Sequence, residues 1–175
     1  MRRLNVEIKA RTADSSGVRK TLEGLGARFV GTDHQTDTYF VAGHGRLKLR
    51  EGNVETALIW YDRPDEEAPK ASDVLLYHPA DAGDLKEILT RLFDVDVVVK
   101  KRREIFFVDN VKFHIDEVPG LGHFVEIEAM DGDRGRTSSD LLCQCRRYME
   151  ILGIRDDDLV DVSYSDLLRP TGSRS

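Results

Sequence analysis

The stretch LNVEIKAR, residues 4–11, alternates apolar and polar side chains with a period of two, as a β-strand with two different faces does. Val6, Ile8 and Ala10 share the apolar face. The other face carries only functional groups: Asn5, Glu7, Lys9 and Arg11. Taken alone, the pattern fits a solvated edge strand as well as it fits the wall of a binding site.

Three later segments repeat this pattern of charged residues at every second position. The repeated residues are Arg46, Lys48 and Arg50 in the first segment, Lys112, His114 and Asp116 in the second, and Glu126 and Glu128 in the third. The repetition favours one polar face that is shared by several strands of a sheet.

Strand and turn signals predict about eight strands that are joined mostly by hairpins. The predicted strands span residues 4–11, 28–40, 46–50, 55–63, 73–78, 95–108, 111–118 and 123–130. Helices with one apolar stripe are predicted over residues 14–25, 81–92 and 135–152, with a further short helix between 156 and 168. Residues 1–170 are expected to form a single domain, followed by a disordered tail over residues 171–175.

The helices decide which way the charged faces point. Each apolar helix stripe must pack on the apolar face of the strands, so the charged faces look away from the helices. An open sheet would expose those faces to water, and the chain would then be a structural α+β domain. A sheet that curls closed would instead enclose them, and it would remove the exposed edges of the outer strands. We predict the second arrangement, an α+β fold in which a closed antiparallel β-barrel of about eight strands forms a tunnel and the helices pack outside.

The composition excludes several classes of protein. With 175 residues, 40% of them hydrophobic, the chain is long enough for one domain with its own core. Its net charge of -6 argues against binding to duplex nucleic acid or to an anionic membrane surface. The sequence has neither an apolar run of about 20 residues nor a signal-type hydrophobic region, so we expect a cytoplasmic protein. Cys143 and Cys145 are expected to be free thiols on a helix, and a homodimer is one assembly that the sequence leaves open.

The predicted tunnel concentrates cations, which are Lys9, Arg11, Arg46, Lys48, Arg50 and Lys112. Two like charges about 4 Å apart repel by roughly 4 kcal/mol at an effective dielectric constant of about 20, so these cations need anionic partners. Carboxylates supply part of the negative charge: Glu7, Asp116, Glu126 and Glu128. A triphosphate with a divalent metal ion would satisfy both groups, because carboxylates bind Mg²⁺ or Mn²⁺ while Arg and Lys bind phosphate oxygens.

Several short motifs follow one another in an order that is known from one protein family. They are EIK at residues 7–9, DTYF at 37–40, RLKLRE at 46–51, KKRR at 100–103, His114 followed by DEV at 116–118 and LG at 121–122, and FVEIE at 124–128. Over about residues 4–153, the chain resembles the CYTH superfamily, which is named for class IV adenylyl cyclases and thiamine triphosphatases. The resemblance implies a triphosphate tunnel fold, a small-molecule triphosphate as substrate, and Mg²⁺ or Mn²⁺ as cofactor.

The resemblance also implies roles for individual residues. The implied metal ligands are Glu7, Glu126 and Glu128, with Asp116 as a further one, and the implied catalytic residues are Lys9 and Glu7. The implied phosphate-binding residues are Lys9, Arg11, Arg46, Lys48, Arg50, Arg63, Lys101, Arg103, Lys112 and His114. Within the KKRR motif we prefer Lys101 and Arg103, which share one face of their strand, to their two neighbours. For His114 itself, a structural hydrogen bond is favoured over a role as general base.

Three functions fit these residues, and we take the first as the leading hypothesis. In a class IV adenylyl cyclase, the ribose 3′ oxygen of ATP attacks the α-phosphate to give cyclic AMP and pyrophosphate. In a triphosphatase, water attacks the terminal phosphorus of inorganic, nucleoside or thiamine triphosphate. Asn5 replaces the first glutamate of the family's usual Glu-x-Glu-x-Lys signature, and a carboxamide brings no charge to a metal site. A protein that binds a triphosphate or nucleotide without catalysis is therefore the third alternative.

Overall fold

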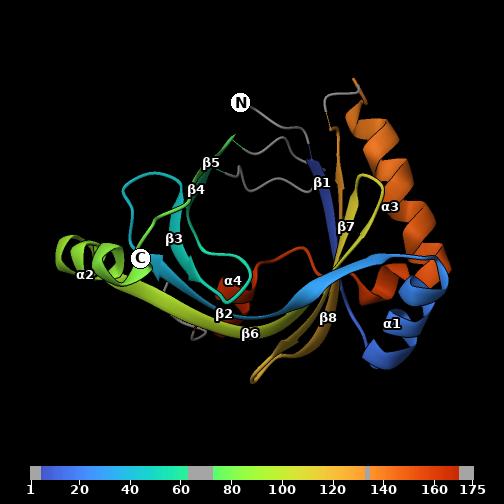
Figure 1. Ribbon diagram of the computed structural model, residues 1–175, viewed down its shortest axis with the longest axis horizontal. Helices are drawn as coiled ribbons and strands as arrows, with labels where there is room; N and C mark the ends of the chain where they lie inside the picture. The colour runs from blue at the N-terminus through green and yellow to red at the C-terminus, as the bar shows by residue number, and fades with distance from the viewer. Residues whose placement is uncertain (1–4, 63–72, 133–134, 170–175) are drawn as a thin grey trace.

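The computed structural model describes residues 5–62, 73–132 and 135–169 of the chain. Its strands form one antiparallel sheet in the order β1-β8-β7-β6-β2-β3-β4-β5 (Figure 1). The strands are β1 (Asn5–Arg11), β2 (Arg28–Phe40), β3 (Arg46–Glu51), β4 (Ala57–Asp62), β5 (Asp73–Tyr77), β6 (Val95–Val108), β7 (Val111–Val118) and β8 (Gly122–Met130). The helices are α1 (Ser15–Gly24), α2 (Ala82–Leu92), α3 (Ser138–Leu152) and α4 (Tyr164–Leu168), with a 3₁₀ turn (Asp156–Asp158) before α4. Within the described ranges, the predicted strands and helices are confirmed in number and order, although α3 begins at residue 138 rather than 135.

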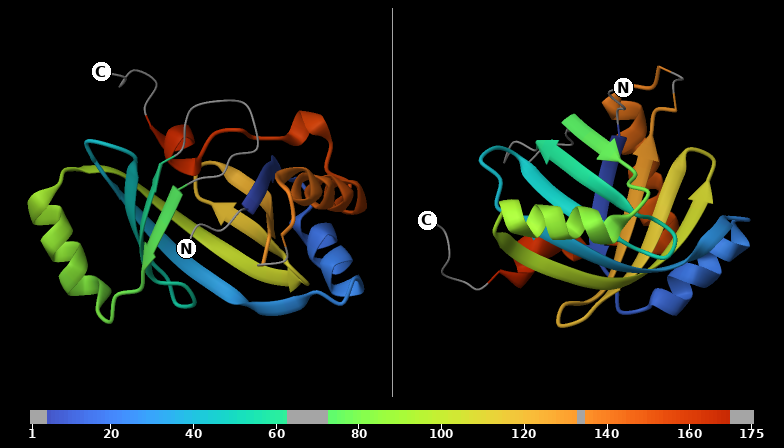
Figure 2. Two further views of the ribbon diagram at one scale, coloured as in Figure 1. Left: turned by 90° about the horizontal axis from the view of Figure 1, so that it is seen from above. Right: turned by 60° about the vertical axis from the view of Figure 1, so that its left-hand side comes forward.

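The sheet curls strongly around a concave face (Figures 1 and 2). Its two longest strands, β2 and β6, pair through the middle of the sheet with register shifts at residues 29–31 and 39–40, and such bulges increase bending and twist. β1 and β5 stand at the two ends of the strand order, and in the described part of the chain they do not pair with each other. The predicted curled antiparallel sheet is confirmed, but it is a half-barrel and not the fully closed barrel that we expected.

α1 and α3 cover the outer face of β1, β7 and β8 (Figure 1). The core between them is made of apolar side chains from both layers: Val6, Val18, Leu22, Phe113, Val125, Ile127, Leu141, Cys145 and Met149. A capping box of Thr137 and Asp140 starts α3, and Gly153, with a φ of 69°, ends it in the left-handed region. The apolar face of the stretch at residues 4–11 thus points outward to the helices, which leaves its polar face on the concave side.

α2 packs on the outer side of β2 and β3, where Leu89 contacts Phe40 and Leu49. Of the helices in the described ranges, none combines the length and the apolarity that crossing a lipid bilayer requires. Cys143 and Cys145 are free thiols, as predicted.

α4 differs from the other helices because it packs on the concave side of the sheet. The ring of Tyr164 lies 4.9 Å from that of Phe124, which shares the concave face of β8, and joins a core with Tyr39. The chain before α4 is tied to β1, since the amide of Val160 donates a hydrogen bond to the carbonyl of Lys9 (2.9 Å). The C-terminal segment therefore fills part of the hollow from within, whereas we predicted helices only on the outside.

Candidate functional site

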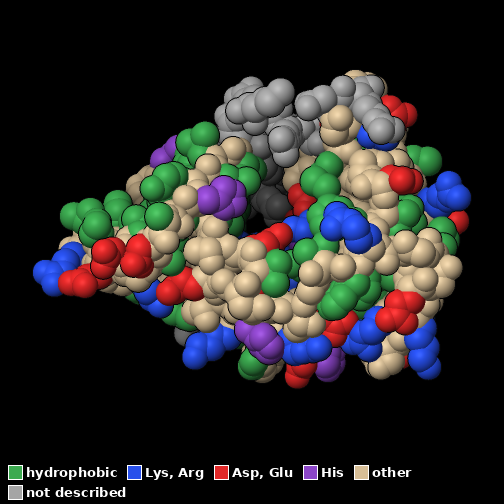
Figure 3. Space-filling model, viewed as in Figure 1, with side chains coloured by type: hydrophobic (Ala, Val, Ile, Leu, Met, Phe, Trp, Pro, Cys, Tyr) green, Lys and Arg blue, Asp and Glu red, His purple; other side chains and the backbone are tan. Residues whose placement is uncertain are grey.

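The concave face collects charged side chains from six neighbouring strands: β1, β8, β7, β6, β2 and β3. Strand register arranges them in rows, of which one holds Lys9, Glu126 and His114. The next row holds Glu7, Glu128 and Lys112. In Figure 3 the molecule is hollowed between the two ends of the sheet, and side chains of both charges border the hollow. The face that the sequence predicts to be polar is thus the concave face of the sheet.

Asp37 of β2 is the centre of one buried cluster. Its side chain is 2% exposed and accepts hydrogen bonds from three cations: Lys48 (3.1 Å), Arg50 (2.8 and 2.9 Å) and Lys101 (2.8 Å). Burial opposes the ionisation of Asp37, but Lys48 and Lys101 outweigh it and hold the pKa of this carboxyl well below its usual range. Two strands, β3 and β6, therefore bring three cations to a single carboxylate of β2, and we call these four residues the Asp37 cluster.

Arg103 of β6 is the centre of a second buried cluster. Its guanidinium donates hydrogen bonds to both carboxylate oxygens of Asp116 (2.7 and 2.5 Å) and to Oε2 of Glu126 (2.6 Å). Nδ1 of His114 lies 3.0 Å from the same oxygen of Glu126. Burial lowers the pKa of His114 and the Arg103 charge lowers it further, so the ring is neutral at pH 7. These four residues form the Arg103 cluster, in which each buried charge has a partner of opposite sign.

Lys9 lies where β1 meets the C-terminal segment. Its Nζ is 3.6 Å from Oε1 of Glu126, 4.4 Å from the ring centroid of Tyr164, and donates a hydrogen bond to the carbonyl of Val162 (3.3 Å). The hydroxyl of Tyr164 donates to Asp116 (2.8 Å). Burial, together with Glu126 and Asp116, raises the pKa of Tyr164 above its usual value, so this hydroxyl keeps its proton. The ammonium of Lys9 is thus fixed at the border of the Arg103 cluster.

Glu55, in the loop between β3 and β4, connects the remaining cations. It accepts a hydrogen bond from Nζ of Lys112 (2.6 Å) and lies 3.5 Å from Arg50. Burial opposes the ionisation of Glu55, but Lys112 and Arg50 outweigh it and lower its pKa to about 2.

We expect Glu55 to contribute to the loss of stability in acid. Because its folded pKa lies below the ordinary value of 4.5, its stabilisation is present above about pH 4.5 and is lost as the pH falls toward 2. In thermal melts between pH 3 and 6, the melting temperature of Glu55→Gln should therefore fall less steeply with decreasing pH than that of the wild type. Glu23→Gln, a change at an exposed carboxylate of α1, serves as the control and should follow the wild-type slope. Equal slopes for all three proteins would contradict this role of Glu55.

Two predicted phosphate-binding residues have other surroundings, and a third is not among the described residues. Arg46 of β3 donates hydrogen bonds to Asp166 and to the hydroxyl of Ser163 (both 3.0 Å), at the start of α4. Arg11 is exposed and donates to the carbonyl of Leu121 (2.9 Å). Arg63 lies outside the described residues.

The carboxylates that the resemblance implies as metal ligands fall into two pairs. In the first pair, Glu7 and Glu128 lie opposite each other on β1 and β8, and Nδ2 of Asn5 donates a hydrogen bond to Oε1 of Glu128 (2.8 Å). In the second pair, Asp116 and Glu126 both belong to the Arg103 cluster. Across the described ranges, no three His, Cys, Asp or Glu side chains are gathered closely enough to hold a metal ion.

These carboxylates differ in how well they suit a metal ion. Glu7, Glu126 and Glu128 are hard oxygen donors on one face of two neighbouring strands, and such donors suit Mg²⁺ or Mn²⁺. Asp116 fits poorly, because Arg103 binds both of its oxygens and Tyr164 donates to one of them.

Sequence analysis found the cations of the concave face but missed several of their partners: Asp37, Glu55, Tyr164 and Asp166. The sequence did contain a sign of Asp37, because this residue belongs to the DTYF motif and lies on the same strand face as Tyr39. The other three lie in a loop or in the short C-terminal helix, where no periodic pattern indicates which way a side chain points.

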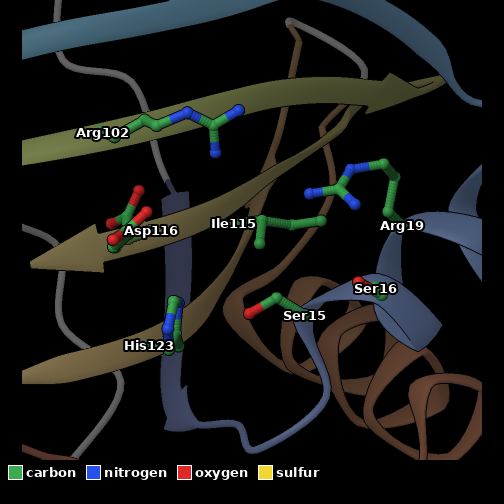
Figure 4. A pocket seen from close by; sticks show the side chains of 8 residues that line it. Ser15, Ser16, Arg19, Arg102, Ile115, Asp116 and His123 are labelled. Carbon is green, nitrogen blue, oxygen red and sulfur yellow. The ribbon is translucent and has the colours of Figure 1, made fainter.

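A separate pocket of about 190 Å³ lies outside the concave face, beside the start of α1 (Figure 4). It is lined by Ser15, Ser16, Arg19, Arg102, Ile115, Asp116, Glu117 and His123. Both of its arginines bind Glu104, Arg19 through Nε at 2.6 Å and Arg102 through Nη1 at 2.8 Å. Since the positive charge of this pocket is already compensated, the concave face is the stronger candidate site.

Known proteins resemble this chain over nearly its whole length. The model of the CYTH domain family matches residues 3–164. A Methanocaldococcus jannaschii protein named "Putative adenylate cyclase MJ0240" is 25% identical over an alignment of 173 residues, and the match covers 94% of this chain and 98% of that protein.

Solved structures show the same likeness. The PH1012 protein of Pyrococcus horikoshii superposes with a TM-score of 0.82 and 27% identity, over 94% of this chain and 99% of that chain. A Hippeastrum protein, "Putative adenylyl cyclase HpAC1", is described as having a dominant triphosphatase activity. It superposes with a TM-score of 0.65 and covers 94% of each chain, but at 14% identity it shows the fold alone.

Proposed function

Since this chain belongs to the CYTH domain family, we propose that the concave face of its sheet binds a triphosphate and catalyses phosphoryl-transfer chemistry on it. Members of this family are adenylyl cyclases or triphosphatases, so a triphosphate-related activity follows from the family membership. The binding site, the reaction and the residues named below are our proposal.

The observation that carries the proposal is the number of cations on one concave face. Lys48, Arg50, Lys101 and Arg103 come from two strands, and their side chains are at most 12% exposed. A guanidinium binds phosphate oxygens in pairs and a lysine binds them as a point charge, so a polyanion suits this face. The remaining proposed phosphate-binding residues extend the same face: Lys9, Arg11, Arg46, Arg63, Lys112 and His114.

Lys9 is the proposed catalytic lysine, because its ammonium lies beside Glu126 of the Arg103 cluster, one row along the sheet from the pair of Glu7 and Glu128. From there it would polarise the attacking group or stabilise charge on the phosphate oxygens. Glu7, Glu126 and Glu128 are the proposed ligands of Mg²⁺ or Mn²⁺, which would neutralise phosphate charge when bound. Asn5 donates a hydrogen bond to Glu128, so it occupies one oxygen of that set and adds no charge.

The first candidate reaction is that of a class IV adenylyl cyclase. Its support is the name of the Methanocaldococcus jannaschii relative, which covers nearly the whole chain. In this reaction the 3′ oxygen of ATP attacks the α-phosphorus, and the bond from that phosphorus to the oxygen that bridges it to the β-phosphorus breaks. Pyrophosphate leaves, and the cations of the concave face stabilise its negative charge.

The second candidate is a triphosphatase, in which water attacks the terminal phosphorus and the bond from that phosphorus to the bridging oxygen breaks. The diphosphate part of the substrate is the leaving group, and the attacked phosphorus is released as orthophosphate. The described activity of the Hippeastrum protein of the same fold supports it. The same residues serve either reaction, since phosphoryl transfer depends on positioning and charge stabilisation more than on covalent groups.

A substrate panel tests the proposal and separates the two reactions. The purified protein is incubated with inorganic tripolyphosphate, ATP, GTP or thiamine triphosphate, each with Mg²⁺, with Mn²⁺ or with EDTA. Cyclic AMP with an equal amount of pyrophosphate is expected from the cyclase, and orthophosphate from the triphosphatase, in both cases only with metal. Absence of every product with both metals would contradict catalysis and leave the binding protein as the remaining alternative.

A further inference from the structure

The Asp37 cluster has more positive than negative charge. One carboxylate is shared by three cations, all from neighbouring strands of the concave face. Lys48 has a second partner in the hydroxyl of Tyr39 (3.3 Å), and Arg50 has one in Glu55. For the ammonium of Lys101, Asp37 is the one side-chain partner among the described residues.

Lys101 is in a difficult position for a charged group, because its side chain is 1% exposed. The charged groups that bear on it are Asp37 of β2, Lys48 and Arg50 of β3, and Arg103 of its own strand. Burial and the three neighbouring cations lower the pKa of Lys101 to about 7, although Asp37 opposes them. Tyr39 on β2 has a pKa raised to about 12 and stays neutral, and Asp116 on β7 is bonded to Arg103. Asp37 is thus the group that favours the charged form of Lys101.

We propose that Asp37 is a positioning residue for the triphosphate: it assembles the three cations in the free protein and favours the charged form of Lys101 inside the sheet. A phosphate group would then meet a preformed cationic site, and little of its binding free energy would be lost in ordering side chains. The inference rests on the proposed function, because it describes how that same site receives its ligand. It assigns to Asp37 no contact with the reacting atoms.

Replacement of Asp37 by asparagine keeps the shape of the side chain and removes its charge. Lys101 should then give up its proton in the free protein and recover it when a polyanion binds. Relative to the wild type, the loss of affinity should be small at pH 5.5, grow with pH, and level off above about pH 7, where Lys101 is neutral in both free proteins. A fall of one unit in the pKa of Lys101 corresponds to about a tenfold loss of affinity at a pH where Lys101 is neutral in both free proteins. For a fall of about one unit, the loss of affinity at pH 8 should exceed that at pH 5.5 about tenfold.

Calorimetric titration with inorganic tripolyphosphate in EDTA, between pH 5.5 and 8.5, tests the inference. The ratio of wild-type to variant affinity at each pH cancels the titration of the ligand. Lys101→Arg provides the matched background, because a guanidinium stays charged at every pH used. In that background Asp37→Asn should change the affinity by a factor that does not depend on pH. Asp33→Asn, the same change on the same face of β2, removes a carboxylate that binds the amides of Val54 and Glu55, and should lower the melting temperature without a pH-dependent loss of affinity.

A second measurement needs only the single variant. Titration at pH 7 in two buffers of different ionisation enthalpy gives the number of protons taken up on binding, which should be larger for Asp37→Asn than for the wild type. An affinity ratio that is flat with pH, with equal proton uptake, would overturn the role of Asp37 while the wild type still binds tripolyphosphate. If the wild type itself does not bind, the proposed function fails and this inference fails with it.

Discussion

Replacing Arg103 with methionine should lower the free energy of unfolding by about 3–5 kcal/mol, the usual cost of removing one partner from a buried ion pair. The side chains of Asp116 and Glu126 are 0% and 7% exposed. Asp116 depends on this guanidinium for a charged partner, and Glu126 would keep only the more distant Lys9, at 3.6 Å. In the variant, Tyr164 and His114 remain as hydrogen-bonding partners, but neither is positively charged. Chemical denaturation at pH 7 measures the difference.

The neighbouring residue provides the control for this prediction. Arg102→Met makes the same change on the opposite face of β6, where the side chain is 42% exposed and Glu104 keeps Arg19 as a partner. We expect it to cost about 1 kcal/mol or less. Equal losses from the two variants would show that Arg103 does not hold the concave face together.

Lys9→Met should reduce turnover by about 10²–10³-fold, which is typical for loss of one group that stabilises charge in a transition state. The fold should survive, because Lys9 lies at the border of the Arg103 cluster and Glu126 keeps Arg103 as its main partner. Rates measured at saturating substrate, on whichever triphosphate the panel identifies, separate this effect from a loss of binding.

Two further variants sharpen the test of Lys9. Lys20→Met removes an exposed lysine of α1 and should leave turnover unchanged. Lys9→Arg keeps the charge but changes its geometry, so it should recover binding more than rate. A Lys9→Met protein with wild-type turnover would remove Lys9 from the proposed mechanism.

The alternation in residues 4–11, together with its repeats in three later segments, predicted which face of the sheet is polar. Its apolar side chains meet α1 and α3, while Glu7 and Lys9 face the carboxylates of β8. The same period of two led us to prefer Lys101 to Lys100 as a residue of the site. In the structure, Lys101 is buried on the concave face and Lys100 is exposed. Strand parity is a local property, so one sequence is sufficient to read it.

The remaining features depend on contacts between distant segments. β2 is polar at successive positions near Asp37, so its pattern did not reveal that this carboxylate is buried among three cations. Tyr164 reaches Asp116 only because the C-terminal segment returns along β1, and a helix of five residues has no periodicity that could predict this. The degree of curl is a sum over all strand pairs and their bulges, which explains why a half-barrel and a closed barrel looked alike in the sequence.

The central claim is that the cations of the concave face bind a polyphosphate. Calorimetric titration of the wild type and of Arg50→Met with inorganic tripolyphosphate tests it most directly. We predict saturable one-to-one binding to the wild type, with an accompanying rise in melting temperature, and binding to Arg50→Met that is weaker by about tenfold or more. No binding heat and no thermal shift in the wild type at millimolar tripolyphosphate, or equal affinities for the two proteins, would contradict the account.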